Sequence, residues 1–589
     1  MDPITAAGIS LSVASLALQT FAGCVKGYQL FSEAKDMPAR YQHLRVRLRI
    51  EESRLLNWGQ KVGLEQERLN NPSRTLLQNG ELIIKVMLEM QALFKETTHI
   101  VDEFNPYIQE PAAEIGTTEA TFDKRVPKPQ NSMLEKTLKF FEKMSQTKIR
   151  LTWAMIKKDK FGSLIEKLIE YNTYIEGLLD RSAMEHLHFM QQQTYMAMLQ
   201  LNSSVAELKE ISMAMKLKTP NTSSGNGSLS SPQRSHDNSD VNGDDASFAR
   251  LADFKAHQTF LDSGTPDIQP IPSIEVDVEE SEDETRSEGF YRAANVWIEW
   301  KRYPVDVNPH SERNKTIEDR IKKLAILLGS ESKPEQFGAP HCIGYFNDES
   351  EDRYGFLYQK PENVPATTKP TSLHDLLNPT SKPSLTTRIT LAHAISRCLM
   401  YLHSVNWLHK GLRSSNILFF TPPPKTPAYD EPIIAGFEYA RPDRPDEETD
   451  RPPQHSKHDI YRHPDTLTGR SRSQKSHDVY SLGVVLVEIA CWRRIDEVLD
   501  IPDLDVPKLL KKALQSIGQV RKRLLEEGFQ RDLENDVGEV YGAAVRKCLA
   551  GGKELGIPTG ARETDPDVGA MMQSVFSEEI VNKLGEIKI

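Results

Sequence analysis

Apolar residues recur at helical spacing through the first 217 residues of the chain. The segment from Ile4 to Val25 contains no charged residue, and its polar residues fall on one helical stripe. Amphipathic patterns predict further helices at residues 41–62, 76–94, 134–141 and 161–179. In the first of these helices, the apolar residues occupy one face, and the arginines at positions 45, 47, 49 and 54 lie on the other faces. We therefore expect an all-α helical bundle over residues 1–182 and a connector or brace helix over residues 183–217.

Two interpretations of the first helix stay open. A helix that is apolar nearly all round has to be buried, either in the core of a bundle or in lipid. The stretch from Ile4 to Val25 approaches the roughly 20 residues that span a bilayer, and Gly23 and Gly27 form a GxxxG spacing that favours helix association in lipid. Lysines between positions 136 and 160 fit either a solvated face or attraction to anionic headgroups, worth about 1 kcal/mol each. Both interpretations hold if the helix can leave the bundle.

The composition changes after residue 217. Residues 219–247 are rich in Ser, Asn, Gly and Asp, and the acidic run EVDVEESEDE follows further on. Such a composition cannot bury enough apolar surface to offset the entropy of ordering the chain. Residues 218–288 are therefore predicted to be a disordered acidic linker, although the patch at residues 248–261 could form a helix or dock on a neighbour.

From residue 289 onward, strand patterns come first and helical patterns follow. The run VWIEWK, from Val296 to Lys301, alternates as a half-buried strand does. Residues 356–359 give a second strand, and long helical patterns begin at residue 385. This order predicts an α+β fold over residues 289–589.

The segment LTTRITLAHAISRCLMYLHSVNWLHKGLRSSNILFF, residues 385–420, resembles the helix and catalytic loop of protein kinases. The kinase loop reads HRDLxxxxN; here it runs from His409 to Asn416, with Gly411 in the place of the catalytic Asp. Glycine has no side chain that could accept the proton of a substrate hydroxyl. Loss of a general base typically costs about 10²–10⁴ in rate.

A second kinase acid is also missing. The segment PIIAGFEYAR aligns with the strand and DFG triplet of kinases, which puts Gly436 where the magnesium-binding Asp stands. Residues with a structural role in kinases are present. Asn416 ends the loop, and Asp478 lies in a helix similar to the kinase helix whose Asp caps the catalytic loop. Residues 289–589 therefore resemble a pseudokinase, in which neither a catalytic residue nor a metal site is expected.

Nucleotide binding is the part of the kinase resemblance that stays open. The candidate nucleotide-binding residues are Lys301 at the VAIK position, Glu318 as its partner, Tyr358 on the hinge strand, and Asn416. The run SEGFYRAAN offers a single glycine where kinases have GxGxxG, so close backbone approach to phosphates is not expected. No cofactor is required, although ATP could bind without efficient turnover.

The N-terminal sequence resembles the HeLo domain of filamentous fungi. The resemblance rests on MDPITAAGISLSVASLALQTFAGCVKGYQLF and, most specifically, on LRVRLRIEESRLLNWG, and it covers about the first 200 residues. It implies a helical bundle whose N-terminal helix can be released to permeabilise the plasma membrane during regulated cell death, as in heterokaryon incompatibility. The order of bundle, connector, linker and pseudokinase resembles the layout of mixed-lineage-kinase-domain-like necroptosis executioners.

These resemblances predict a cell-death or signalling protein in which a pseudokinase controls a membrane-targeting HeLo bundle. The expected partners are membrane lipids, which residues 4–25 would contact, an upstream receptor or kinase, and further copies of the chain on activation. Two alternatives remain. One is an active atypical kinase that binds ATP and uses Lys301, Asn416 and Glu438, and the other is a signalling adaptor that never reaches a membrane.

Composition narrows the classes further. A net charge of −11 over 589 residues argues against a general nucleic-acid binder, which normally carries a basic stripe. The five cysteines are widely spaced, which is typical of a reducing compartment. Asp2 is the only early charge, so no secretory signal is expected. The predicted location is the cytoplasm, with relocation to the plasma membrane on activation.

Overall fold

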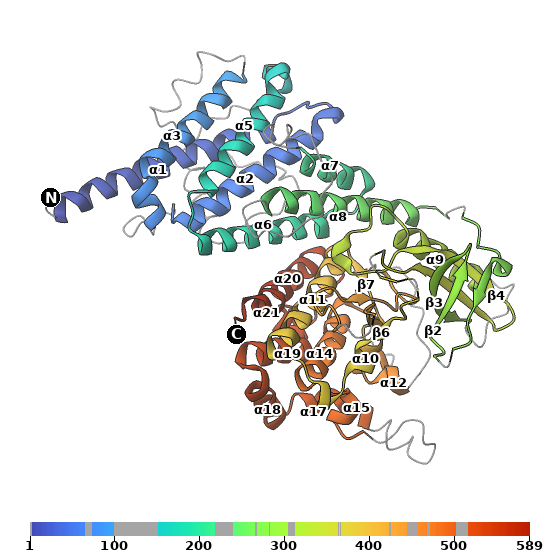
Figure 1. The fold of residues 1–589 in the computed structure, drawn as a ribbon. Helices are drawn as coiled ribbons and strands as arrows, with labels where there is room; N and C mark the ends of the chain where they lie inside the picture. The colour runs from blue at the N-terminus through green and yellow to red at the C-terminus, as the bar shows by residue number, and fades with distance from the viewer. Residues whose placement is uncertain are drawn as a thin grey trace. The chain divides into compact units, whose positions relative to one another are not determined.

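The computed structural model describes residues 3–64, 73–98, 151–217, 240–264, 268–281, 283–303, 312–362, 364–365, 367–422, 426–443, 456–467, 472–501 and 516–588. The chain divides into two compact units, Met1–Asp253 and Phe254–Ile589, which we call unit 1 and unit 2. Figure 1 shows that the described part of unit 1 is helical, whereas unit 2 combines a sheet with many helices.

Unit 1 is built from helices whose ends follow local sequence signals. These helices are α1 (Pro3–Ser32), α2 (Gln42–Val62), α3 (Arg74–Glu96), α5 (Lys158–Glu176), α6 (Arg181–Leu201), α7 (Val205–Met215) and the first part of α8 (Asp240–Asp262). Ser73 caps α3 by accepting a hydrogen bond from the Leu76 amide at 3.2 Å, and Asp180 caps α6 in the same way. Gly63 ends α2 with a φ of 79°. The helix predicted at residues 134–141 lies outside the described residues.

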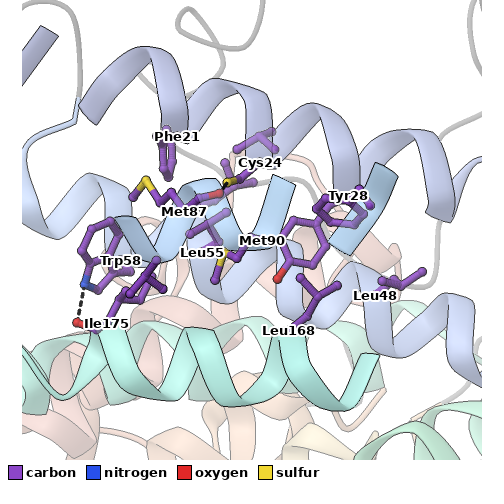
Figure 2. Close-up of a cluster of buried hydrophobic side chains, with 14 of the residues drawn as sticks. Phe21, Cys24, Tyr28, Leu48, Leu55, Trp58, Met87, Met90, Leu168 and Ile175 are labelled. Atoms are coloured by element: carbon purple, nitrogen blue, oxygen red, sulfur yellow. Dashed lines mark hydrogen bonds between the residues drawn. The ribbon is translucent and has the colours of Figure 1, made fainter. Parts of the chain in front are cut away.

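The core of unit 1 lies between α1, α2, α3 and α5. Figure 2 shows side chains from all four helices meeting there, among them Phe21, Leu55, Met90 and Leu168. Trp58 is fully buried, and its indole Nε1 donates a hydrogen bond to the carbonyl of Ile175 at 3.0 Å. The amphipathic patterns of the sequence therefore face one shared apolar core.

The N-terminal part of unit 2 is an antiparallel sheet covered by a helix. Its strands are β1 (Val276–Val278), β2 (Arg286–Tyr291), β3 (Ala294–Arg302), β4 (Cys342–Asp348) and β5 (Arg353–Gln359), hydrogen-bonded in the order β1-β2-β3-β5-β4. Helix α9 (Glu312–Leu328) lies between β3 and β4 in sequence and contacts β4. Strands β2 and β3 form a hairpin whose turn residues Arg292 and Ala293 have φ values of 47° and 64°, as a two-residue hairpin turn requires.

The rest of unit 2 is mainly helical. Its longer helices are α11 (Leu385–Ser404), α14 (Lys475–Cys491), α18 (Glu527–Val537), α19 (Glu539–Ala550) and α20 (Pro566–Phe576). Shorter helices are α10 (Leu373–Leu376), α12 (Ser456–Asp459), α13 (Pro464–Leu467), α15 (Ile495–Val498), α17 (Val520–Leu524) and α21 (Lys583–Glu586). Short strands β6 (Thr371–Ser372), β8 (Ile417–Phe419) and β9 (Ile433–Ile434) form one small sheet, and β7 (Trp407–Leu408) pairs with β10 (Arg441–Pro442).

The linker prediction for residues 218–288 is wrong over much of its length. The structure places α8, β1 and the start of β2 in this range, while residues 218–239 lie outside the described part. The side chains of Phe248, Leu251 and Phe254 in α8 are buried. The sequence analysis allowed a helix at residues 248–261, where apolar residues recur at a spacing of three, but the average composition of the segment outweighed this signal.

Candidate functional site

Glycines bring α1 close to its neighbours α2 and α3. A Cβ placed on Gly27 would overlap the ring of Phe94 on α3, and a Cβ on Gly59 of α2 would overlap the ring of Phe21. Gly23 meets a side chain of α3 in the same way. Small residues at this spacing let helix backbones approach closely. The GxxxG spacing that the sequence analysis linked to lipid thus supports packing inside the bundle.

The inner side of α1 is buried, whereas its outer side reaches solvent. Cys24 is fully buried, and its Sγ donates a hydrogen bond to the Met87 carbonyl at 3.2 Å. Leu16, on the other side, is 51% exposed. We call the surface that receives the helix the α1 seat, and we define it by Gly59, Gly80, Met87 and Phe94. The α1 seat therefore covers one side of α1 only.

The helix enclosed by the bundle is α2 rather than α1. Every residue of α2 from Val46 to Gly59 is buried. Of the two interpretations of the first helix, the structure shows the one in which the helix packs in the bundle, although α1 lies at the edge of the core. Within the described ranges, no helix is apolar over enough length to cross a bilayer.

Beneath α1, buried charges join α2 to α5. The Arg54 guanidinium lies 2.5 Å from a Glu176 oxygen and 3.1 Å from Glu51, while Arg47 lies 2.8 Å from Glu51. The Asn172 amide donates a further hydrogen bond to Glu51 at 2.8 Å. Burial alone would lower the pKa of Arg54, but Glu176 and Glu51 outweigh it and raise that pKa well above the usual value. The arginine-rich stretch of the sequence is thus an internal ion network.

In unit 2, Asp478 contacts the backbone of the segment that the sequence analysis compared with the kinase catalytic loop. The Asp478 carboxylate accepts hydrogen bonds from the backbone amides of His409 and Lys410, at 2.7 and 2.8 Å. His403 approaches the same carboxylate at 3.3 Å. These bonds to its charged form lower the pKa of Asp478 although burial opposes the change. Asp478 therefore holds the loop backbone.

Gly411 and Gly436, the two positions that the kinase resemblance assigned to acids, lie where a side chain would not fit. Gly436 has a φ of 84°, and a Cβ on it would overlap the Asn416 amide. A Cβ on Gly411 would lie 2.8 Å from the Gly436 carbonyl oxygen. The Asn416 Nδ2 donates to the Gly411 carbonyl at 2.7 Å, which joins the three residues. Packing has closed the space that the two acids would need.

An ion pair that the sequence analysis missed lies beside these glycines. Glu299 accepts a hydrogen bond from the Gly436 amide at 2.9 Å and pairs with Arg286 at 3.1 Å. Arg286 also donates to the Ser415 carbonyl at 2.6 Å and to the Asn416 side chain. Burial raises the pKa of Glu299, and Arg286 opposes this rise. The signal in the sequence was a charged residue inside the apolar alternation VWIEWK.

The four candidate nucleotide-binding residues do not form one site. Lys301 donates to the Glu438 carbonyl at 2.9 Å, whereas Glu318 pairs with Lys322 at 3.1 Å. The ring of Tyr358 lies 4.7 Å from that of Trp297. Asn416 belongs to the cluster around Gly436. The contacts described for Lys301 and for Glu318 join each of them to a different residue.

A cavity of about 450 Å³ opens beside strand β2 and the segment that contains β6 and α10. Its described lining includes Trp297 and Arg286, and none of the four candidate residues is part of it. Carboxylates dominate its charge, with lining residues Glu279, Glu280, Asp283, Glu288 and Asp375. Such a lining repels a triphosphate. Among the residues that the structure describes, no cluster of His, Cys, Asp or Glu side chains is arranged to hold a metal ion.

These features define a multidomain protein with an all-α N-terminal unit and an α+β C-terminal unit. Residues 8–211 match the HeLo family, described as prion-inhibition and propagation, which confirms the predicted HeLo domain. Residues 346–586 match a family described as a domain of unknown function, DUF7580. No curated protein matches the chain at a significant level. The HeLo family implies a function related to fungal cell death or incompatibility.

Proposed function

We propose that this chain is a regulated cell-death protein whose HeLo domain acts on a membrane through α1 and whose unit 2 is a pseudokinase that controls this action. The observation that carries the proposal is the seating of α1. Contacts over glycines hold the helix, its outer side is already exposed at Leu16, and the sequence from Ile4 to Val25 is free of charge. Once released, α1 would expose its inner apolar side, which lipid can cover.

The ion network supports release of α1, because its charged members lie on other helices. Arg47, Arg54 and Glu51 belong to α2, and Glu176 belongs to α5. From α1, Tyr28 contacts the network through a hydrogen bond that its hydroxyl accepts from the Asn172 amide at 3.3 Å. Departure of α1 would thus break apolar and neutral contacts and leave the buried ion pairs intact. The cost of release is then the exposure of the inner apolar side of α1, which lipid can offset, and not the loss of ion pairs.

Unit 2 suits control by conformation rather than by catalysis. Asp478 still holds the loop backbone, whereas Gly411 and Gly436 supply no acid for phosphoryl transfer. The Arg286–Glu299 pair fills the neighbourhood of Gly436 with the chain's own charges. In this proposal an upstream receptor or kinase acts on unit 2, no nucleotide is needed, and copies of the chain assemble as they move from the cytoplasm to the plasma membrane.

The test is dye release from anionic liposomes by the full chain and by residues 1–217, which contain helices α1 to α7 and the whole match to the HeLo family. Leu16→Glu adds a charge to the exposed side of α1, so the bundle should stay folded while burial of α1 in lipid becomes unfavourable. The matched control is Leu77→Glu on α3, because Leu77 is 55% exposed. We expect leakage from residues 1–217 that Leu16→Glu abolishes and Leu77→Glu preserves. Absence of leakage from every protein would favour the adaptor alternative.

A further inference from the structure

Helix α8 lies beyond the residues that match the HeLo family, yet it docks onto the HeLo bundle. An Asp245 oxygen lies 2.8 Å from the Arg47 guanidinium, and the other accepts a hydrogen bond from the Tyr195 hydroxyl at 3.2 Å. The rings of Tyr195 and Phe248 meet edge to face, 5.0 Å between centroids. One helical turn of α8 thus engages both α2 and α6.

A third contact extends this docking surface to the end of α7. Lys216 follows α7 and pairs with Asp253 of α8 at 2.6 Å. We call Arg47, Tyr195 and Lys216 the α8 groove. Each of these residues meets a complementary residue of α8: Arg47 meets Asp245, Tyr195 meets Phe248, and Lys216 meets Asp253. A helix that carries an acid, an aromatic residue and a second acid at this spacing therefore fits the α8 groove.

The charge balance of the bundle shows that α8 can leave without stranding a charge. Without Asp245, the joined network still contains two arginines, Arg47 and Arg54, and two glutamates, Glu51 and Glu176. Arg47 is 1% exposed while α8 is docked, and departure of α8 would bring water to its guanidinium. A core helix that supplied an indispensable counter-ion would not have this property.

Beyond Asp253, the same helix contributes to unit 2. The ring of Phe254 lies 5.0 Å from that of Phe337 and 5.4 Å from that of Trp407. Trp407 in turn lies 5.8 Å from Phe437, the residue that follows Gly436. Rearrangement of the segment around Gly436 would therefore disturb the packing at the C-terminal half of α8.

We propose that α8 is a detachable regulatory helix, bound in the resting chain to the α8 groove through Asp245 and Phe248, and released when unit 2 rearranges. The docking itself is independent of any membrane. The consequence, that undocked α8 allows α1 to leave its seat, rests on the function proposed above.

Hydrogen exchange on the full chain tests the docking. Asp245→Arg puts a second cation beside Arg47, so exchange across residues 245–253 should rise about tenfold or more, while α3 and α5 keep their protection. The matched control is Asp253→Asn, which removes an acid paired with the 57% exposed Lys216 and should change exchange by less than about threefold. Unchanged exchange in Asp245→Arg would overturn the proposal. Loss of protection in α3 and α5 as well would also overturn it, because α8 would then be part of the core.

A second variant and a second readout separate the two proposals. Phe248→Ala removes the ring that faces Tyr195 without adding charge, and it should also raise exchange across residues 245–253. Each variant is then assayed for dye release from the same anionic liposomes. Faster exchange together with increased leakage supports both proposals. Faster exchange without leakage supports the docking and contradicts the membrane function.

Discussion

Both units bury charged side chains, but the buried charges do different things. In unit 1, Arg54 reaches Glu51 on its own helix and Glu176 on α5, so the ion pairs hold two helices together. In unit 2, Arg286 and Glu299 lie on adjacent strands and point at the loop residues Asn416 and Gly436. The first network joins two helices of a bundle, whereas the second joins the sheet of unit 2 to the loop residues around Gly436.

This difference indicates where each unit can change. In unit 1 the joined ion pairs lie on α2 and α5, with Asp245 of α8 as a further member, whereas α1 packs through Gly23 and Gly27, so the apolar helix is separable from the buried charges. In unit 2 the space around Gly436 is filled, and Asp478 holds the loop backbone. We infer that unit 1 carries a part that can move away, and the proposed control by unit 2 would act on that part.

The largest expected effect comes from breaking the frame of unit 1. Arg54→Ala leaves Glu51 and Glu176 buried without a shared cation, and we expect the free energy of unfolding to fall by about 3–5 kcal/mol. Urea denaturation followed by circular dichroism measures this change. The control is Arg181→Ala, because Arg181 pairs with Glu185 while 93% exposed, and its loss should cost less than about 1 kcal/mol. Equal effects of the two variants would contradict the role given to the network.

The second prediction tests the closed site of unit 2. Gly436→Asp restores a kinase acid, but its Cβ overlaps Asn416 at a φ of 84°. We expect a loss of stability above the about 1–3 kcal/mol of backbone strain alone, and no transfer of radiolabelled phosphate even when Gly411→Asp is added. Gly560→Asp separates strain from overlap, because Gly560 has a φ of 82° and no atom near its Cβ position. Phosphate transfer by the double variant would favour the atypical-kinase alternative.

The third prediction concerns the α1 seat. Gly27→Ala pushes a methyl group into Phe94, which should cost about 1–3 kcal/mol and increase liposome leakage by weakening the contact that retains α1. Gly162→Ala on α5 is the matched control, because no atom lies near its Cβ position. That change should leave stability unchanged or raise it by about 0.5–1 kcal/mol. Reduced stability with unchanged leakage would show that the contact between Gly27 and Phe94 stabilises the bundle but does not control the action of α1 on a membrane.

Motifs made of neighbouring residues were predictable from the sequence, whereas partners distant in the chain were not. The stretch around Trp58 pointed to the HeLo domain, which the family match confirms, whereas the comparison of residues 409–416 with a kinase loop stays a prediction. The burial of Arg54 could not be foreseen, because its partner Glu176 lies 122 residues away. Hydrophobic periodicity shows which positions are apolar or polar, but it does not show which residue of opposite charge will pair with a given charged residue in the fold.

Two expectations depended on local patterns alone. Lys301 and Glu318 were paired by analogy with kinases, whereas among the described contacts Lys301 donates to the Glu438 carbonyl and Glu318 pairs with Lys322. The linker prediction followed the average composition of residues 218–288 and gave too little weight to the apolar run that begins at Phe248, which is buried. In both cases a local pattern was interpreted without the tertiary contacts that decide it.

The smallest predicted effect is a pH dependence that distinguishes the buried acids of the two units. Glu488 on α14 accepts hydrogen bonds from the Tyr461 hydroxyl at 2.7 Å and from the Ile495 amide at 3.0 Å. Burial raises the pKa of Glu488 from 4.5 to about 8, although these hydrogen bonds oppose the rise. No cation appears among the described contacts of Glu488, whereas Glu51 and Glu176 of unit 1 are paired with arginines.

The folded chain therefore keeps the Glu488 proton between pH 4.5 and about 8, while the unfolded chain loses it. The stability that this protonated group contributes is fully present below pH 4.5 and is lost as the pH rises through about 8. Glu488→Gln mimics the protonated acid at every pH, so the fall in the free energy of unfolding from pH 5 to pH 8 should shrink by about 1 kcal/mol or more. Urea denaturation at both pH values measures the difference, and an unchanged fall would show that Glu488 is ionised in the folded chain and that unit 2 tolerates an unpaired buried charge.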